Sequence, residues 1–125
     1  MKSLLLVAAG GAIGCMLRYA TGLLVAPQTI AWRFPVATFA VNVLGCLIAG
    51  LLIGLGENRA FLTPDLRVLL FTGFLGGFTT FSAFGVETVS LLEKGELLVA
   101  MGYIVLSVLC GLAALWAAVK IGAAM

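Results

Sequence analysis

The sequence contains no histidine, and its three cysteines, Cys15, Cys46 and Cys110, stand far apart in apolar runs. Zinc sites need closely spaced Cys and His ligands, and a disulfide framework needs cysteines that pair. Acid–base and nucleophilic catalysis most often depend on a histidine beside the reacting group. The sequence therefore predicts neither a Cys/His metal centre nor an enzyme, and it favours three small, buried cysteines.

Charged residues are also scarce. Lysine and arginine number 7, aspartate and glutamate number 5, and 63% of the 125 residues are hydrophobic. This is too little charge to cover a soluble domain, so the composition is typical of an integral membrane protein. The net charge of +2 is spread over turns and segment ends, which argues against nucleic acid as a partner.

Four hydrophobic segments follow one another, each near the ~20 residues that a helix needs to cross a bilayer. They are Ser3 to Val25, Phe34 to Gly56, Arg67 to Leu92 and Leu97 to Val119. Short separators begin at Pro27, Glu57 and Glu93. We expect an all-α membrane protein whose four transmembrane helices form a single domain, residues 1–125. A cleaved secretory signal is a weaker interpretation of the first segment, because its apolar run continues beyond Cys15.

The basic residues divide almost evenly between the two sides of such a bundle. The side of the termini has Lys2, Arg59, Arg67 and Lys120, and the other side has Arg33, Lys94 and, if it reaches the surface, Arg18. The positive-inside rule barely selects an orientation from this division. The chain can then insert in both directions and pair with an inverted copy of itself. An ordinary chain with both termini inside fits the charges equally well.

The third segment is interrupted at GFLGGFTTFSAFGVE, residues 73–87. Gly76 and Gly77 weaken the helix near mid-span, while Thr79, Thr80 and Ser82 offer hydroxyls to unpaired backbone groups. A broken backbone at membrane depth persists only where it is buried in protein or lines a cavity, and its carbonyl oxygens can then hold a cation. A kinked packing helix explains the same residues equally well.

Three polar side chains lie inside the apolar segments. Asn42 offers two amide N–H donors, either to an anion or to a neighbouring helix. Arg18 and Glu87 lie at a comparable depth from the same membrane surface, so we expect them to share a polar layer and to pair. The alternative for Arg18 is that its side chain extends to the headgroups.

Small residues recur at the spacing of helix-packing motifs. Gly10 is followed by Gly14, and Gly50 by Gly54. Such pairs let helix backbones approach closely and predict a compact bundle, without indicating an activity.

Two further pairs of side chains share helix faces. Phe81 and Phe84 lie three residues apart, and such a pair is usually core packing. The electropositive edges of phenyl rings can also guide a small anion. Tyr103 and Ser107 place two hydroxyls on one face of the fourth segment. Together with Asn42, these residues outline a path lined by hydrogen-bond donors.

Three blocks of sequence carry a family resemblance: GGAIGCMLRY at 10–19, TFAVNVLG at 38–45 and GFLGGFTTFSAF at 73–84. In order and spacing they resemble the Fluc, or CrcB-type, fluoride channels of microbial membranes, over nearly the whole chain. Ala83 and Phe78 depart from the family pattern, in which threonine and a smaller aliphatic residue are common. Both departures leave the break and the ring pair intact and concern only details of conduction.

The resemblance implies an antiparallel, dual-topology homodimer that exports fluoride passively across the cytoplasmic (inner) membrane. It implies a structural sodium ion at the dimer interface, held by the backbone carbonyls of Gly76 and Thr79. The implied fluoride pore residues are Asn42, Phe81, Phe84, Tyr103 and Ser107, and the implied vestibule residue is Arg18.

Two other functions stay open on the sequence. A small multidrug or cation exporter has a similar length and span number, but it needs a membrane carboxylate that faces its substrate. Glu87 is the only acidic residue inside any span. A scaffold subunit without transport activity would need only the packing glycines, and the polar residues would then have no use.

Overall fold

The computed structural model describes residues 1–58 and 62–125. Within these ranges the regular elements are all helical and no strand is present, which confirms the all-α part of the predicted fold class. The elements are α1 (Lys2–Thr29), α2 (Val36–Asn58), α3 (Pro64–Arg67), the π-helical η1 (Val68–Leu75), α4 (Gly76–Phe78), α5 (Phe81–Glu93) and α6 (Leu97–Ala124).

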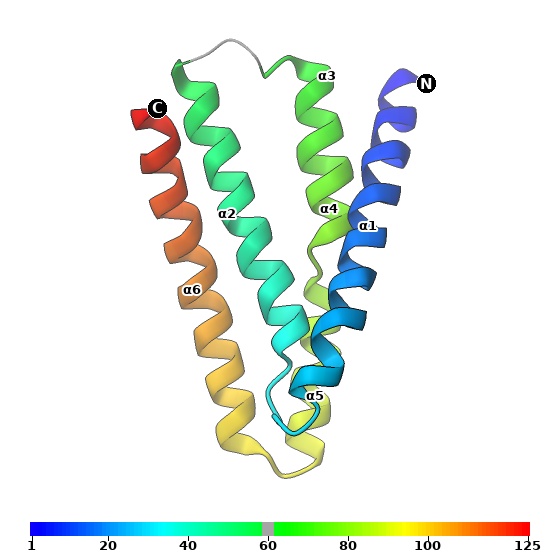
Figure 1. Cartoon of the computed structure of the whole chain (residues 1–125), viewed down its shortest axis with the longest axis vertical. Coiled ribbons are helices and arrows are strands. Elements are labelled where there is room, and N and C mark those ends of the chain that lie inside the picture. Colours follow the sequence, from blue (N-terminus) through cyan, green and yellow to red (C-terminus); the bar gives the residue numbers. More distant parts are fainter. Residues whose placement is uncertain (59–61) are drawn as a thin grey trace.

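Among the described residues, four helical stretches are long and apolar enough to cross a membrane: Lys2–Thr29, Val36–Glu57, Pro64–Glu93 and Leu97–Ala124. They overlap the four predicted segments, so the predicted number of spans is confirmed. The third is composite, because α3, η1, α4 and α5 follow one another with an interruption between the last two. Successive spans run in opposite directions, and both termini lie at the same end of the bundle (Figure 1).

The first span runs further than predicted. Pro27, expected in a separator, lies inside α1, which ends at Thr29 instead of Val25. Proline lacks an N–H and removes one hydrogen bond from a helix, a small loss so close to its end. The Thr29 hydroxyl donates to the Val25 carbonyl at 3.0 Å within this last turn. Arg59, counted above on the side of the termini, lies outside the described residues.

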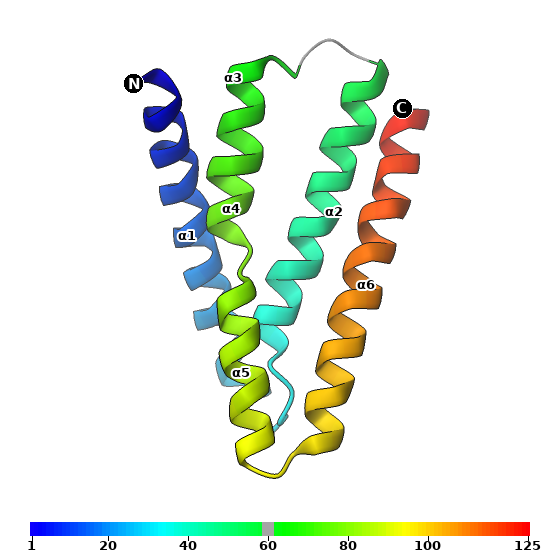
Figure 2. The same cartoon turned by 180° about the vertical axis from the view of Figure 1, so that it is seen from behind.

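The spans form two closely packed pairs, α2 with α6 and α1 with η1 and α4 (Figures 1 and 2). On α2, a Cβ at Gly50 would lie 2.3 Å from the Leu115 carbonyl oxygen, and one at Gly54 would lie 2.2 Å from that of Val119. Side-chain carbons do not approach backbone oxygens so closely, so glycine is needed at both positions.

The same principle joins α1 to the first half of the third span. A Cβ at Gly10 would lie 2.4 Å from the Leu69 carbonyl oxygen, and one at Gly14 would lie 2.2 Å from that of Phe74. The predicted packing role of both glycine pairs is therefore confirmed.

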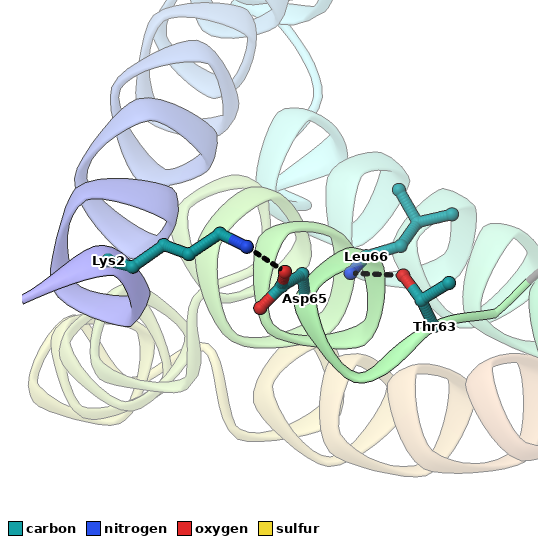
Figure 3. A network of polar contacts seen from close by, with 4 residues as sticks. All are labelled: Lys2, Thr63, Asp65 and Leu66. Atoms are coloured by element: carbon teal, nitrogen blue, oxygen red, sulfur yellow. Dashed lines mark hydrogen bonds and ion pairs between the residues drawn. The ribbon is translucent and has the colours of Figure 1, made fainter.

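An ion pair at each end of the bundle connects residues near the ends of different spans. Lys2 at the start of α1 pairs with Asp65 at the start of α3 (Figure 3). Beside them, the Thr63 hydroxyl accepts a hydrogen bond from the Leu66 N–H at 3.3 Å and caps α3. At the opposite end, Arg33 before α2 pairs with Glu96 before α6. These exposed pairs orient the helix ends and add little stability.

Candidate functional site

The interruption of the third span lies at Thr79 and Thr80. Both residues are extended, with φ and ψ of −85° and 161° at Thr79 and −153° and 121° at Thr80. Gly76 and Gly77, predicted to weaken the helix, are helical and form α4. The break therefore comes after the glycine pair and falls on the two threonines.

Gly77 has a packing role instead. A Cβ at this position would lie 2.6 Å from the Gly11 carbonyl oxygen and 3.0 Å from the Gly11 Cα. The absence of a side chain at Gly77 thus lets α4 lie against the backbone of α1, as in other close helix contacts of membrane proteins.

Hydroxyl and amide groups replace the hydrogen bonds that the break removes. The Thr80 hydroxyl accepts from the Ala83 N–H at 3.2 Å and caps α5, and the Thr79 hydroxyl donates to the Leu75 carbonyl at 2.9 Å. From α2, Asn42 Nδ2 donates to the Thr80 carbonyl at 3.0 Å, and Asn42 Oδ1 accepts from the Thr80 N–H at 2.8 Å. The prediction that hydroxyls would serve unpaired backbone groups is confirmed for Thr80. The Thr79 hydroxyl donates to a carbonyl that already accepts from the Thr79 N–H, and the Ser82 hydroxyl lies 3.3 Å from that of Thr80. Asn42 bridges two helices.

Arg18 and Glu87 line a common cavity of about 770 Å³ between α1, α2 and α5, but they do not pair. The Arg18 guanidinium donates to the Thr79 carbonyl at 3.1 Å. The Glu87 carboxylate accepts from the Thr38 hydroxyl and the Tyr103 hydroxyl, each at 2.7 Å. The predicted ion pair is therefore wrong in this structure, because each group is already engaged by neutral partners. The Arg18 side chain also points to the break instead of extending to the headgroups.

A second, smaller cavity of about 280 Å³ lies on the other side of the break, between α2, α5 and α6. Asn42, Phe81, Phe84 and Ser107 all line it. The two phenyl rings are tilted by 36° with centroids 5.6 Å apart. The Ser107 Oγ is buried and has no hydrogen-bond partner among the described residues. The structure thus brings together four of the residues that the sequence singled out, and one of them has an unused hydroxyl.

Tyr103 does not line this cavity. It is fully buried, and its hydroxyl is directed to Glu87. Its ring centroid lies 5.0 Å from that of Phe84 and 5.2 Å from that of Phe34. The two hydroxyls that the sequence placed on one face of α6 therefore have different surroundings, with Ser107 at the cavity and Tyr103 within the core behind the Phe84 ring.

Sequence reasoning missed Thr38, which holds Glu87, and Cys46, which lines the smaller cavity. A signal for both was present, because Thr38, Asn42 and Cys46 are spaced four residues apart and share one face of α2. Extending the face of Asn42 by one turn in each direction would have found them.

Most of the chain is similar in sequence to one known family. Residues 5–119 match the family model described as CrcB-like protein, Camphor Resistance (CrcB). A relative from Methylobacillus flagellatus, named fluoride-specific ion channel FluC, is 52% identical over 116 residues, which cover 93% of this chain and 91% of the relative. Relatives of the same name from Chloroflexus aurantiacus and Flavobacterium psychrophilum are 48% and 44% identical, and each is covered over more than nine-tenths of its length. Together with its four spans, these matches make the chain a multi-pass membrane protein of the CrcB family.

Proposed function

We propose that the protein is a fluoride-selective ion channel that exports fluoride passively across the cytoplasmic (inner) membrane and so lowers its cytoplasmic concentration. The observation that carries the proposal is the 52% identity to a fluoride-specific ion channel over 93% of this chain. The family match at residues 5–119 includes the break and every residue that lines the two cavities.

The smaller cavity supports an anion path. Fluoride is small and strongly hydrated, so it enters a narrow path only where donors replace its water. The Ser107 hydroxyl has no other partner among the described residues, and the Asn42 amide keeps one N–H beyond the bond to Thr80. The Phe81 and Phe84 rings add electropositive edges without a full charge that would trap the ion.

The larger cavity suits a vestibule. Arg18 uses one N–H for the Thr79 carbonyl and directs another to the Cys15 thiol at 3.7 Å, so several of its five N–H groups stay available. A guanidinium at the wall of a wet cavity raises the local concentration of anions. The negative charge of Glu87 opposes this effect less than a free carboxylate would, because two hydroxyls donate to it.

The active unit is proposed to be an antiparallel homodimer in which copies of both orientations pair. Phe81 lines the smaller cavity, and yet 84% of its surface is exposed in the single chain. Lipid against Phe81 would close an ion path, whereas a second, inverted copy would complete the cavity wall. The nearly even division of lysine and arginine between the two ends is compatible with insertion in both directions.

A structural sodium ion at the dimer axis is proposed to bind the carbonyls of Gly76 and Thr79. In an unbroken helix the Thr80 N–H would donate to the Gly76 carbonyl, but here it donates to Asn42 and leaves that carbonyl without its helical partner. The Thr79 carbonyl keeps one lone pair beside its bond to Arg18. The Arg18 charge opposes a cation at the Thr79 carbonyl, and carbonyls of the partner subunit have to offset it.

The test is efflux from liposomes that contain the purified protein and are loaded with potassium fluoride or potassium chloride. An ion-selective electrode follows the anion after valinomycin is added. We expect rapid fluoride efflux and little chloride efflux. Absent fluoride efflux, or equal chloride efflux, contradicts the channel proposal. Proton-driven ethidium transport by the same liposomes would favour the cation exporter instead.

Assembly and the cation need separate tests. Single cysteines at each terminus, in a protein that lacks Cys15, Cys46 and Cys110, should be labelled from both sides of the membrane. Labelling from one side alone would contradict dual topology. A high-resolution structure of the dimer should contain an ion between the Gly76 and Thr79 carbonyls, and a water at hydrogen-bonding distance in its place would contradict the sodium proposal.

A further inference from the structure

Thr79 has little freedom at the break. Its N–H and its hydroxyl both donate to the Leu75 carbonyl at 2.9 Å, and its own carbonyl accepts from Arg18. Only the Cγ2 methyl is left without a polar contact, and it lies over Gly45 of α2. The Thr79 hydroxyl is thus bonded to the preceding helical turn, while the Thr79 methyl contacts the neighbouring helix α2.

Gly45 leaves room for that methyl. A Cβ at position 45 would lie 2.1 Å from Thr79 Cγ2, but 3.6 Å from Thr79 Cβ and 3.8 Å from the Phe78 ring. The clash is therefore confined to a single methyl group. Rotating the Thr79 side chain does not relieve it cheaply, because Cγ2 and the hydroxyl share one Cβ, and moving the methyl takes the hydroxyl away from the Leu75 carbonyl.

Gly45 differs from the packing glycines further along α2. Gly50 and Gly54 face backbone oxygens of α6 and set the distance between two helices. Gly45 faces a side chain of the broken segment and lies three residues after Asn42, so both residues lie on one face of α2. From that face, Asn42 holds the Thr80 main chain while Gly45 receives Thr79.

We propose that Gly45 is a positioning residue for ion conduction. Because Gly45 has no side chain, the Thr79 methyl packs against α2 at this position, and this contact sets the conformation of the segment that forms one wall of the smaller cavity. The inference rests on the proposed channel function. Thr79 and Thr80 line this cavity beside Ser107. A displaced Thr79 changes both the shape of the cavity wall and the direction of the Thr79 carbonyl.

The test is a double-mutant cycle of Gly45→Ala and Thr79→Ser. Serine keeps the hydroxyl and lacks the methyl that a Cβ at position 45 would meet. Gly102→Ala is the control, because nothing lies within 4 Å of a Cβ added there. Fluoride efflux is measured per folded, reconstituted protein, with chloride efflux and the midpoint of thermal unfolding measured alongside.

We expect Gly45→Ala to lower fluoride efflux about tenfold or more, and Gly102→Ala to stay within about twofold of the parent protein. Thr79→Ser alone is the reference for the cycle, and the Gly45→Ala/Thr79→Ser protein should conduct about as well as Thr79→Ser. If Gly45→Ala alone does not fold, the double variant should restore both folding and efflux. The proposal is overturned if Gly45→Ala conducts like the control, if it lowers only the unfolding midpoint, or if the double variant recovers nothing.

The cycle also separates this inference from the proposed function. Absent fluoride efflux from the parent protein contradicts the channel itself. The unfolding midpoints then still test the contact between position 45 and the Thr79 methyl. If Thr79→Ser raises the midpoint of Gly45→Ala, the methyl contact exists, whichever ion the protein conducts.

Discussion

Asn42 on α2 holds both polar groups of the Thr80 main chain, donating to its carbonyl at 3.0 Å and accepting from its N–H at 2.8 Å. The Asn42 amide therefore gives the Thr80 N–H the partner that a continuous helix would have supplied, and adds a donor to the carbonyl of this N-cap residue. Backbone groups at membrane depth find no water, so such a replacement is a condition for breaking the helix at all.

Asn42→Ala should lower the free energy of unfolding by about 1–3 kcal/mol, because it leaves the Thr80 N–H without a partner and removes one of the donors to the Thr80 carbonyl. Equilibrium unfolding in mixed micelles measures the change. Thr21→Ala is the control, since the Thr21 hydroxyl bonds only to Leu17 of its own helix. Equal stabilities of the two variants would show that the hydrogen bonds from Asn42 to Thr80 contribute nothing to stability.

Phe81→Ile and Phe84→Ile should both reduce fluoride efflux, because isoleucine has no electropositive ring edge. Their effects on stability should differ. Phe84 packs against the buried Tyr103 ring, and loss of that contact costs about 0.5–1.5 kcal/mol, whereas Phe81 is largely exposed in the single chain. Liposome efflux and thermal unfolding measure the two effects, and unchanged efflux in both variants would remove the rings from the ion path.

Tyr103→Phe and Glu87→Gln should be coupled in a double-mutant cycle on stability by about 1 kcal/mol, because the glutamine carbonyl still accepts from the Tyr103 hydroxyl and only the charge of the acceptor is lost. Arg18→Gln combined with Glu87→Gln should be close to additive, because Arg18 donates to the Thr79 carbonyl and not to Glu87. The opposite pattern, with Arg18 and Glu87 strongly coupled, would mean that the two charges do interact.

Gly14→Ala and Gly22→Ala place the same methyl on one helix in different surroundings. At Gly14 the added Cβ would lie 2.2 Å from the Phe74 carbonyl oxygen, and at Gly22 nothing lies within 4 Å. We expect Gly14→Ala to destabilise the protein by about 1–3 kcal/mol or to prevent folding. Gly22→Ala should leave stability unchanged or raise it by up to ~1 kcal/mol through helix propensity. Thermal unfolding ranks the two, and equal midpoints would exclude close packing of α1 against η1 and α4.

Much of the candidate site could be predicted because its members share helix faces. Phe81 and Phe84 follow helical spacing and do meet Asn42 at the smaller cavity. Helical spacing failed at Tyr103 and Ser107, which share a face of α6 but have different surroundings. One face of a helix is wide enough to contact both the core and a cavity. The rotation of α6 about its axis in the bundle decides which of the two each side chain contacts.

The sequence by itself determined the four spans, the interruption of the third and the glycine positions where helices touch. These features follow from the length of apolar runs and from the small size of glycine, both of which are local properties. Only the tertiary structure placed the break at Thr79 and Thr80, turned Arg18 toward a carbonyl and directed the Tyr103 hydroxyl to Glu87. These choices depend on which donors and acceptors come within about 3 Å across helices, and that is set by the packing of the whole bundle.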